Sequence, residues 1–97
     1  NKIISKIIFY KKNLDLNKIK NKIICIENAD PGYDFIFNYE INGLITKYGG
    51  ANSHMSIRCL EKSLPACIGI GEKYFENLNH KNKIFLDCKN KIIKQII

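Results

Sequence analysis

Short apolar runs separated by polar stretches dominate the chain, and they predict strands. Continuous apolar runs of four to eight residues rich in β-branched residues are typical of strands, including strands buried on both faces. The runs fall at residues 3–10, 22–27, 44–46, 66–71, 83–88 and 91–97, with 22–27 and 66–71 the buried ones. Lys89 and Asn90 separate the last two, which predicts a hairpin. Residues 11–20 are mostly polar and predict a loop or a short edge strand.

A helical pattern covers residues 53–63. Apolar side chains at i, i+3 and i+7 predict one buried stripe, and a pair at i, i+4 on a neighbouring face widens it. The residue before a proline is disfavoured in the α region, so we expect the helix to end at Leu64 and Pro65. The stripe is Ile57, Leu60 and Leu64, and the widening pair is Met55 and Cys59.

Two shorter segments are also predicted to be helical. Asp30 has the character of a cap and Pro31 that of a first helical residue, so residues 30–39 predict a short aromatic-rich core helix. Residues 72–77 predict a helical turn whose Tyr74 and Phe75 cover the core. Helices that follow several strands indicate an α/β fold, with a mixed central sheet and packed helices, in a single domain of 97 residues.

The chemistry concentrates where the third apolar run meets the long helix. Gly49 and Gly50 can adopt positive φ and bring backbone close to a ligand. Asn52 and Ser53 are both good N-cap residues, and the first turn of a helix attracts anions. His54 lies in that turn, where its neutral, nucleophilic form is expected to be favoured. Such a site could accept a phosphoryl group, which Ser53 and backbone N–H groups would stabilise. An ordinary helix start with a nearby histidine has the same pattern, so both interpretations stay open.

Arg58 is the chain's only arginine and follows His54 by one helical turn. Residues at i, i+4 are neighbours on a helix, so Arg58 could pair with a phosphoryl group on His54. It could equally pair with Glu61 on a solvent-facing surface. By contrast, His80 lies among polar loop residues and is interpreted as a plain surface histidine.

Three motifs together resemble a known family. The sequence reads Gly-Gly-Ala-Asn-Ser-His over 49–54, Leu-Pro-Ala-Cys-Ile-Gly over 64–69 and Asn-Ala-Asp-Pro-Gly-Tyr over 28–33. This order resembles the phosphohistidine swivelling (mobile) domain of the phosphoenolpyruvate-utilising enzymes, such as phosphoenolpyruvate synthase and pyruvate phosphate dikinase. The resemblance runs from about residue 23 to residue 71. Many members have Thr in place of Asn52 and Arg in place of Leu60, which argues mildly against the enzyme I branch.

The resemblance implies a swivelling β/β/α fold and a carrier function within a phosphotransferase. His54 would be phosphorylated transiently, with Ser53, Asn52, Gly49, Gly50 and Arg58 shaping the site. The implied partners are an ATP-binding domain, with ATP and Mg²⁺, and an acceptor domain for phosphoenolpyruvate or pyruvate. No cofactor or metal is expected within this domain. The chain begins at Asn, so we expect a domain cut from a longer protein, and the cysteine pattern described below leads us to expect a cytoplasmic one.

Charge and cysteine content leave weaker alternatives. The net charge is +7, but 15 of the 16 basic residues are scattered lysines, so a nucleic-acid module is the less favoured interpretation. A stand-alone enzyme with His54 as general base would need an orienting acid, and none is evident beside the motif. A non-catalytic interaction module remains a third alternative. Cys25, Cys59, Cys67 and Cys88 form no metal-binding spacing and are interpreted as reduced, buried thiols. No apolar run is long enough to span a membrane.

Overall fold

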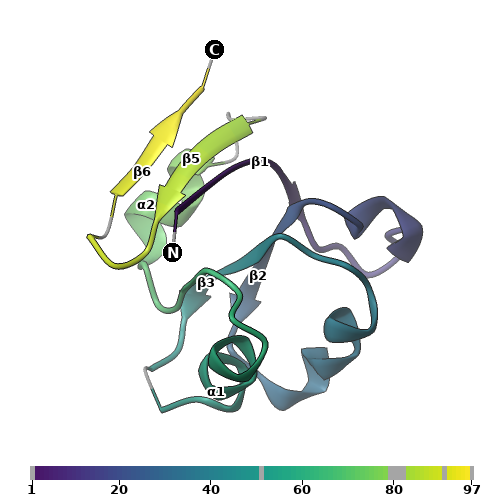
Figure 1. The fold of residues 1–97 in the computed structure, drawn as a ribbon. Coiled ribbons are helices and arrows are strands. Elements are labelled where there is room, and N and C mark those ends of the chain that lie inside the picture. The colour runs from purple at the N-terminus through teal and green to yellow at the C-terminus, as the bar shows by residue number, and fades with distance from the viewer. Residues whose placement is uncertain (1, 51, 79–82, 91, 97) are drawn as a thin grey trace.

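The computed structural model describes residues 2–50, 52–78, 83–90 and 92–96, which form one mixed sheet with helices packed on it (Figure 1). The sheet order is β4-β3-β2-β1-β5-β6. The strands are β1 Lys2–Phe9, β2 Ile23–Asn28, β3 Gly43–Tyr48, β4 Ala66–Cys67, β5 Lys83–Asp87 and β6 Ile92–Gln95. The helices are the 3₁₀ segments η1 Leu16–Ile19 and η2 Pro31–Asn38, with α1 His54–Glu61 and α2 Glu72–Asn77.

Strand β1 joins two differently built halves of the sheet. Its first half pairs antiparallel with β5, and its second half pairs parallel with β2. Strands β2, β3 and β4 continue the parallel half, whereas β5 and β6 form the predicted antiparallel hairpin. Figure 1 shows β5 and β6 inclined to β2 and β3, with α1 beside β3 and α2 behind β5. The α/β prediction with a mixed sheet is therefore confirmed.

Residues of β2 and β3 point alternately into two hydrophobic clusters, as side chains on a strand must. Ile24, Ile26 and Leu44 face the cluster that includes Met55 of α1 and Ile36 of η2. On the other face, Ile23, Cys25 and Ile45 pack with Phe75 of α2 and with Ile84 and Leu86 of β5. The first four residues of β2 are accordingly buried, as their continuous apolar run predicted.

The structure chooses the loop over the edge strand for residues 11–20, and it shortens the predicted strand over 66–71. Residues 11–20 contain no edge strand; they form a loop with η1, which Asp15 caps and which buries Ile19 completely. The predicted buried strand over 66–71 is regular only at Ala66 and Cys67, and both are partly exposed. Gly69 and Gly71 have φ of 71° and 92°, which interrupts the extended conformation. The N–H groups of residues 70 and 71 still donate to carbonyls of β3.

The predicted buried stripe of α1 is wrong. The core contacts come from the Met55 and Cys59 face, which is fully buried, while Ile57 is 50% exposed and Leu60 is 80% exposed. Leu64, beyond the helix, does pack against the first cluster. Both faces carry apolar side chains at helical spacing, so the pattern alone could not decide which one packs on the sheet.

Two details of the α-helices differ from the predictions: the residue at which α1 ends, and which side chain of α2 is buried. Helix α1 stops before Leu64 because Ser63 adopts φ 55°, and the Leu64 N–H then donates to the Cys59 carbonyl at 2.9 Å. This is a Schellman-type C-terminus, with serine where glycine is usual. In α2, Phe75 covers the core as predicted, whereas Tyr74 is mostly exposed.

Candidate functional site

The loop that enters the site depends on a close approach between two glycines. Gly49 has φ 132°, and a Cβ there would lie 2.5 Å from the Cβ of Ala29. A Cβ on Gly69 would overlap the carbonyl oxygen of Gly49. The two glycine motifs therefore meet in space, and each needs a residue without a side chain at the contact. Gly50 differs, because its φ is outside the left-handed region and none of the described residues beyond its chain neighbours comes within 4 Å of its Cβ position.

Thr46 connects the same two segments from inside the sheet. Its side chain is fully buried near the end of β3. The hydroxyl donates to the Tyr48 carbonyl at 2.9 Å and accepts from the Gly69 N–H at 2.8 Å. A buried hydroxyl with both partners satisfied fixes local geometry, because leaving either unpaired would cost about 1–3 kcal/mol. Thr46 thus holds the glycine contact that precedes His54.

Ser53 is the residue that caps α1. Its Oγ accepts a hydrogen bond from the Ser56 N–H at 3.2 Å, and its own backbone N–H donates to the Gly50 carbonyl at 3.0 Å. Asn52, the other candidate cap, is exposed. The Ser53 hydroxyl accepts in this contact, so its own proton can still be donated to a bound anion.

The His54 side chain meets an acid that sequence reasoning missed. Its Nε2 lies 2.8 Å from Oδ1 of Asp34, and Nε of Arg58 donates to the same oxygen at 3.0 Å. The His54 and Asp34 side chains are 43% and 44% exposed, so the cluster is open to solvent. Asp34 lies on η2, 20 residues before His54, where no spacing signal connects the two.

The contacts with His54 and Arg58 stabilise the negative charge of Asp34. Hydrogen bonds from His54, and secondly from Arg58, hold the pKa of the Asp34 carboxyl below its usual range. Asp34 therefore stays ionised to lower pH than an isolated aspartate. A depressed folded-state pKa means that the contact contributes above the ordinary carboxyl pKa and is lost as pH falls through the folded value.

Of the two contacts that the sequence left open for Arg58, the structure shows the one with Glu61. Besides Asp34, Arg58 approaches Glu61, with Nη1 at 3.6 Å from Oε1. Its guanidinium also lies over the Phe37 ring, 5.2 Å from the centroid. An arginine can make several such contacts at once because its planar group has five donors. The guanidinium is therefore held one turn from His54, beside the acid that contacts the imidazole.

The contact with Asp34 also defines the chemistry of the imidazole. In neutral imidazole one nitrogen carries the proton and the other the lone pair. When Nε2–H donates to Asp34, the lone pair resides on Nδ1. The pair can thus orient a nucleophilic histidine, or a general base, in the manner of a base and its orienting acid. The expectation that no orienting acid accompanies the motif is wrong.

The remaining sequence candidates lie outside this cluster or outside the described ranges. Asp30 caps η2 by accepting from the Gly32 N–H at 2.8 Å, and so supports the segment that carries Asp34. His80 lies outside the described residues. Among residues with described positions, no group of three or more His, Cys, Asp or Glu side chains is arranged to hold a metal ion. In the same ranges, no helix has the length and apolar character needed to cross a bilayer.

Comparison with known proteins gives one finding. A sequence model of the family described as "PEP-utilising enzyme, mobile domain" matches residues 18–91. The matched region contains all three sequence motifs and every residue of the His54 cluster. No curated protein matches the chain.

Proposed function

We propose a function for this chain from the premise that it belongs to the mobile-domain family of the PEP-utilising enzymes. The proposed function is phosphoryl transport, in which His54 accepts a phosphoryl group at one site and releases it at another. The observation that carries the proposal is the partly exposed imidazole at the start of α1, oriented by Asp34 and adjacent to Arg58. The family suggests that nucleotide and acceptor sites lie on other domains.

The transfer itself needs a nitrogen lone pair and a stabilised dianion. An imidazole nitrogen attacks the phosphorus, the N–P bond forms, and the bond to the donor's leaving oxygen breaks. If Nδ1 attacks, the Nε2 proton stays hydrogen-bonded to Asp34. If Nε2 attacks, the hydrogen bond between Nε2 and Asp34 must first break, and the proton of the neutral imidazole then resides on Nδ1. The nitrogen that becomes labelled will therefore define what Asp34 does.

Three groups are placed to stabilise the transferred phosphoryl. The Ser53 hydroxyl can donate its proton. The first-turn N–H groups of α1 have no carbonyl partners within the helix, although that of Ser56 donates to the Ser53 hydroxyl. Arg58 lies beside His54 and donates a hydrogen bond to Asp34. A phosphoryl group on His54 would repel the Asp34 carboxylate, because both are negatively charged. We propose that Arg58 exchanges the Asp34 carboxylate for the phosphoryl oxygens, which bear more charge.

The surface next to His54 is suited to docking against another domain. Ile57 follows His54 at i+3, and Leu60 follows Ile57 at i+3, so the three side chains are neighbours on one side of α1. Ile57 and Leu60 are the exposed apolar residues of this helix. We propose that this face covers the transfer site when the domain meets its nucleotide-binding or acceptor partner, because water must be excluded during transfer.

The His54–Asp34 pair also favours a second candidate, a general base without a covalent intermediate. A general base moves a proton and leaves no phosphoryl group on the protein. Covalent labelling therefore separates the two candidates.

The decisive experiment is phosphorylation of the full-length protein with ATP and Mg²⁺, or with phosphoenolpyruvate. Intact-mass analysis at alkaline pH should find one phosphoryl group that is lost in acid. His54→Ala should abolish it, while His80→Ala, which removes the chain's only other histidine, should retain it. NMR of the labelled imidazole would identify the nitrogen.

Two outcomes would contradict the carrier proposal. A label that survives in His54→Ala would place the chemistry elsewhere. Protein that no donor labels, but that binds RNA or DNA with a steep dependence on salt, would instead support the basic nucleic-acid module.

A further inference from the structure

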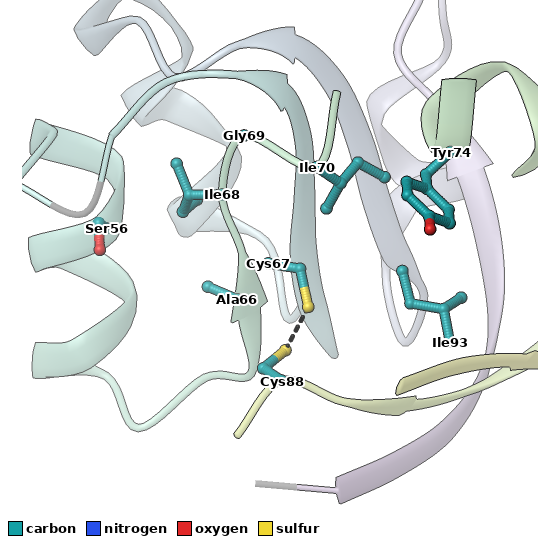
Figure 2. A pocket seen from close by; sticks show the side chains of 9 residues that line it. All are labelled: Ser56, Ala66, Cys67, Ile68, Gly69, Ile70, Tyr74, Cys88 and Ile93. Carbon is teal, nitrogen blue, oxygen red and sulfur yellow. Dashed lines mark hydrogen bonds between the residues drawn. The ribbon is translucent and has the colours of Figure 1, made fainter. Parts of the chain in front are cut away.

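Two cysteines from distant parts of the chain meet beside β4, the edge strand of the sheet. Cys67 ends β4, and Cys88 directly follows β5, 21 residues later. Their Sγ atoms lie 2.9 Å apart, with the thiols pointing at one another (Figure 2). Strands β4 and β5 are not neighbours in the sheet order, so the inclination of the two halves creates this contact.

The pair is accessible, unlike the other two thiols. Cys67 and Cys88 are partly exposed and line a hollow of about 620 Å³. Ile68, Ile70 and Ile93 make much of its wall, and Tyr74 lies at its edge (Figure 2). Cys25 and Cys59 are both 1% exposed. A small oxidant could therefore reach the pair without any unfolding of the core.

We propose that Cys67 and Cys88 are a redox-reactive dithiol, which a hydroperoxide converts into an intramolecular disulfide between β4 and the β5–β6 turn. The inference does not depend on phosphorylation of His54. It assigns a modification site to residues that the proposed phosphoryl transfer does not use.

The reaction divides into two balanced steps. The Cys88 thiol first loses its proton, and the thiolate attacks one peroxide oxygen. The O–O bond breaks and the leaving oxygen takes up that proton, so the products are a Cys88 sulfenic acid and an alcohol, or water from hydrogen peroxide. Cys67 then attacks the sulfenic sulfur, the S–S bond forms, and hydroxide leaves and takes the Cys67 proton as water. Overall, two thiols lose two electrons and two protons, and the peroxide is reduced.

The hydrogen bond between the thiols supports this order of attack. A bond from the Cys67 thiol lowers the pKa of Cys88, and the same contact raises the pKa of Cys67. Burial raises the pKa of Cys25 to about 12 and that of Cys59 to about 11. The thiolate is the reactive form of cysteine, so Cys88 should react first and the two buried thiols last.

Oxidation would also restrain the segment that makes the glycine contact next to His54. Gly69, which packs against Gly49, is only two residues beyond Cys67. A disulfide would tie the start of this segment to the β5–β6 turn. The disulfide closes a loop of about 22 residues, so the midpoint of thermal unfolding should rise by on the order of 10 °C and return on reduction.

The test is to treat the full-length protein, fully reduced beforehand, with hydrogen peroxide and then to alkylate the thiols that remain. Peptide mass analysis should find Cys67 linked to Cys88, while Cys25 and Cys59 are still alkylated. Trypsin cuts between all four cysteines, so each link is identified directly in the unmutated protein. Dimedone, which traps sulfenic acids, should label Cys88 in Cys67→Ser at least tenfold faster than Cys67 in Cys88→Ser. The matched control Cys59→Ser should form the disulfide like the wild type.

Several results would overturn the inference. One is oxidation of Cys25 or Cys59 at the same rate as Cys67 and Cys88. Another is a dominant link between any other pair. A third is an intact dithiol after an excess of peroxide that oxidises free cysteine completely.

Discussion

At the scale of single residues, the site depends on one carboxylate. Oδ1 of Asp34 accepts from both His54 and Arg58, at 2.8 and 3.0 Å. We interpret Asp34 as a positioning residue, since it acts on the reacting group through the imidazole. Misplacing a reacting group by about 1 Å can slow a reaction by about 100-fold.

We therefore expect Asp34→Ala to lower the rate of His54 phosphorylation by roughly 10- to 100-fold. The stability of the fold should change little, because the side chain is exposed. Rapid-quench labelling of the full-length protein would measure the rate, and Asp34→Asn should recover part of it, because an amide oxygen still accepts from Nε2–H.

Asp30 provides the matched control for Asp34. It caps the same 3₁₀ segment, and within the described residues it makes no hydrogen bond or ion pair with the imidazole or the guanidinium. Asp30→Ala should cost about 1 kcal/mol of stability through the lost cap and leave the labelling rate near that of the wild type. Equal loss of rate in both variants would mean that Asp34 acts only through the fold of η2.

At the scale of elements, the turn before α1 is built by two segments that are distant in sequence. Gly49 directly follows β3, and Gly69 lies just beyond β4, yet their backbones are in contact. Thr46 bridges them with two hydrogen bonds. The two parts of the sequence signature thus belong to one structural unit, because the second part supports the loop in the first.

Gly69→Ala should destabilise the protein by about 2–4 kcal/mol, because the added methyl group overlaps the Gly49 carbonyl and Gly69 has a left-handed φ. Gly50→Ala should change stability by less than about 0.5 kcal/mol, because its position is open. Urea unfolding of both variants measures the difference. Similar midpoints for the two variants would refute the close-approach explanation.

At the scale of the whole molecule, one helix lies between the core and the proposed docking surface. Helix α1 packs on the sheet through Met55 and Cys59, and it presents Ile57 and Leu60 to solvent beside His54. Strand β1 lies outside the family match over 18–91, yet it joins the two halves of the sheet. The folded body that presents the proposed carrier surface therefore extends beyond the matched segment.

Opposite faces of α1 should respond differently to substitution. Met55→Ala should cost about 2–5 kcal/mol by leaving a cavity. Leu60→Gln should cost less than about 0.5 kcal/mol, but it should slow phosphoryl exchange with the partner domains by weakening docking. Urea unfolding and single-turnover labelling would measure these effects. A Leu60→Gln variant that unfolds as easily as Met55→Ala, or one that exchanges at the wild-type rate, would contradict this division.

The sequence by itself determined the features that depend on local order. Apolar runs located β1, β2, β3, β5 and β6. Cap chemistry offered Asn52 and Ser53 as the start of α1, with His54 in its first turn. The family match confirmed the resemblance drawn from the motifs. These features follow from residues a few positions apart, which is the range over which strand and helix periodicity and capping act.

Only the tertiary structure decided which distant groups meet. It brought Asp34 to His54 across 20 residues and Cys67 to Cys88 across 21, where no spacing rule applies. It also chose the Met55 face of α1 over the Ile57 face, although both fit a helical stripe. The physical reason is that periodicity states which side chains share a face, whereas packing against the sheet determines which face is buried and which distant side chains come into contact with one another.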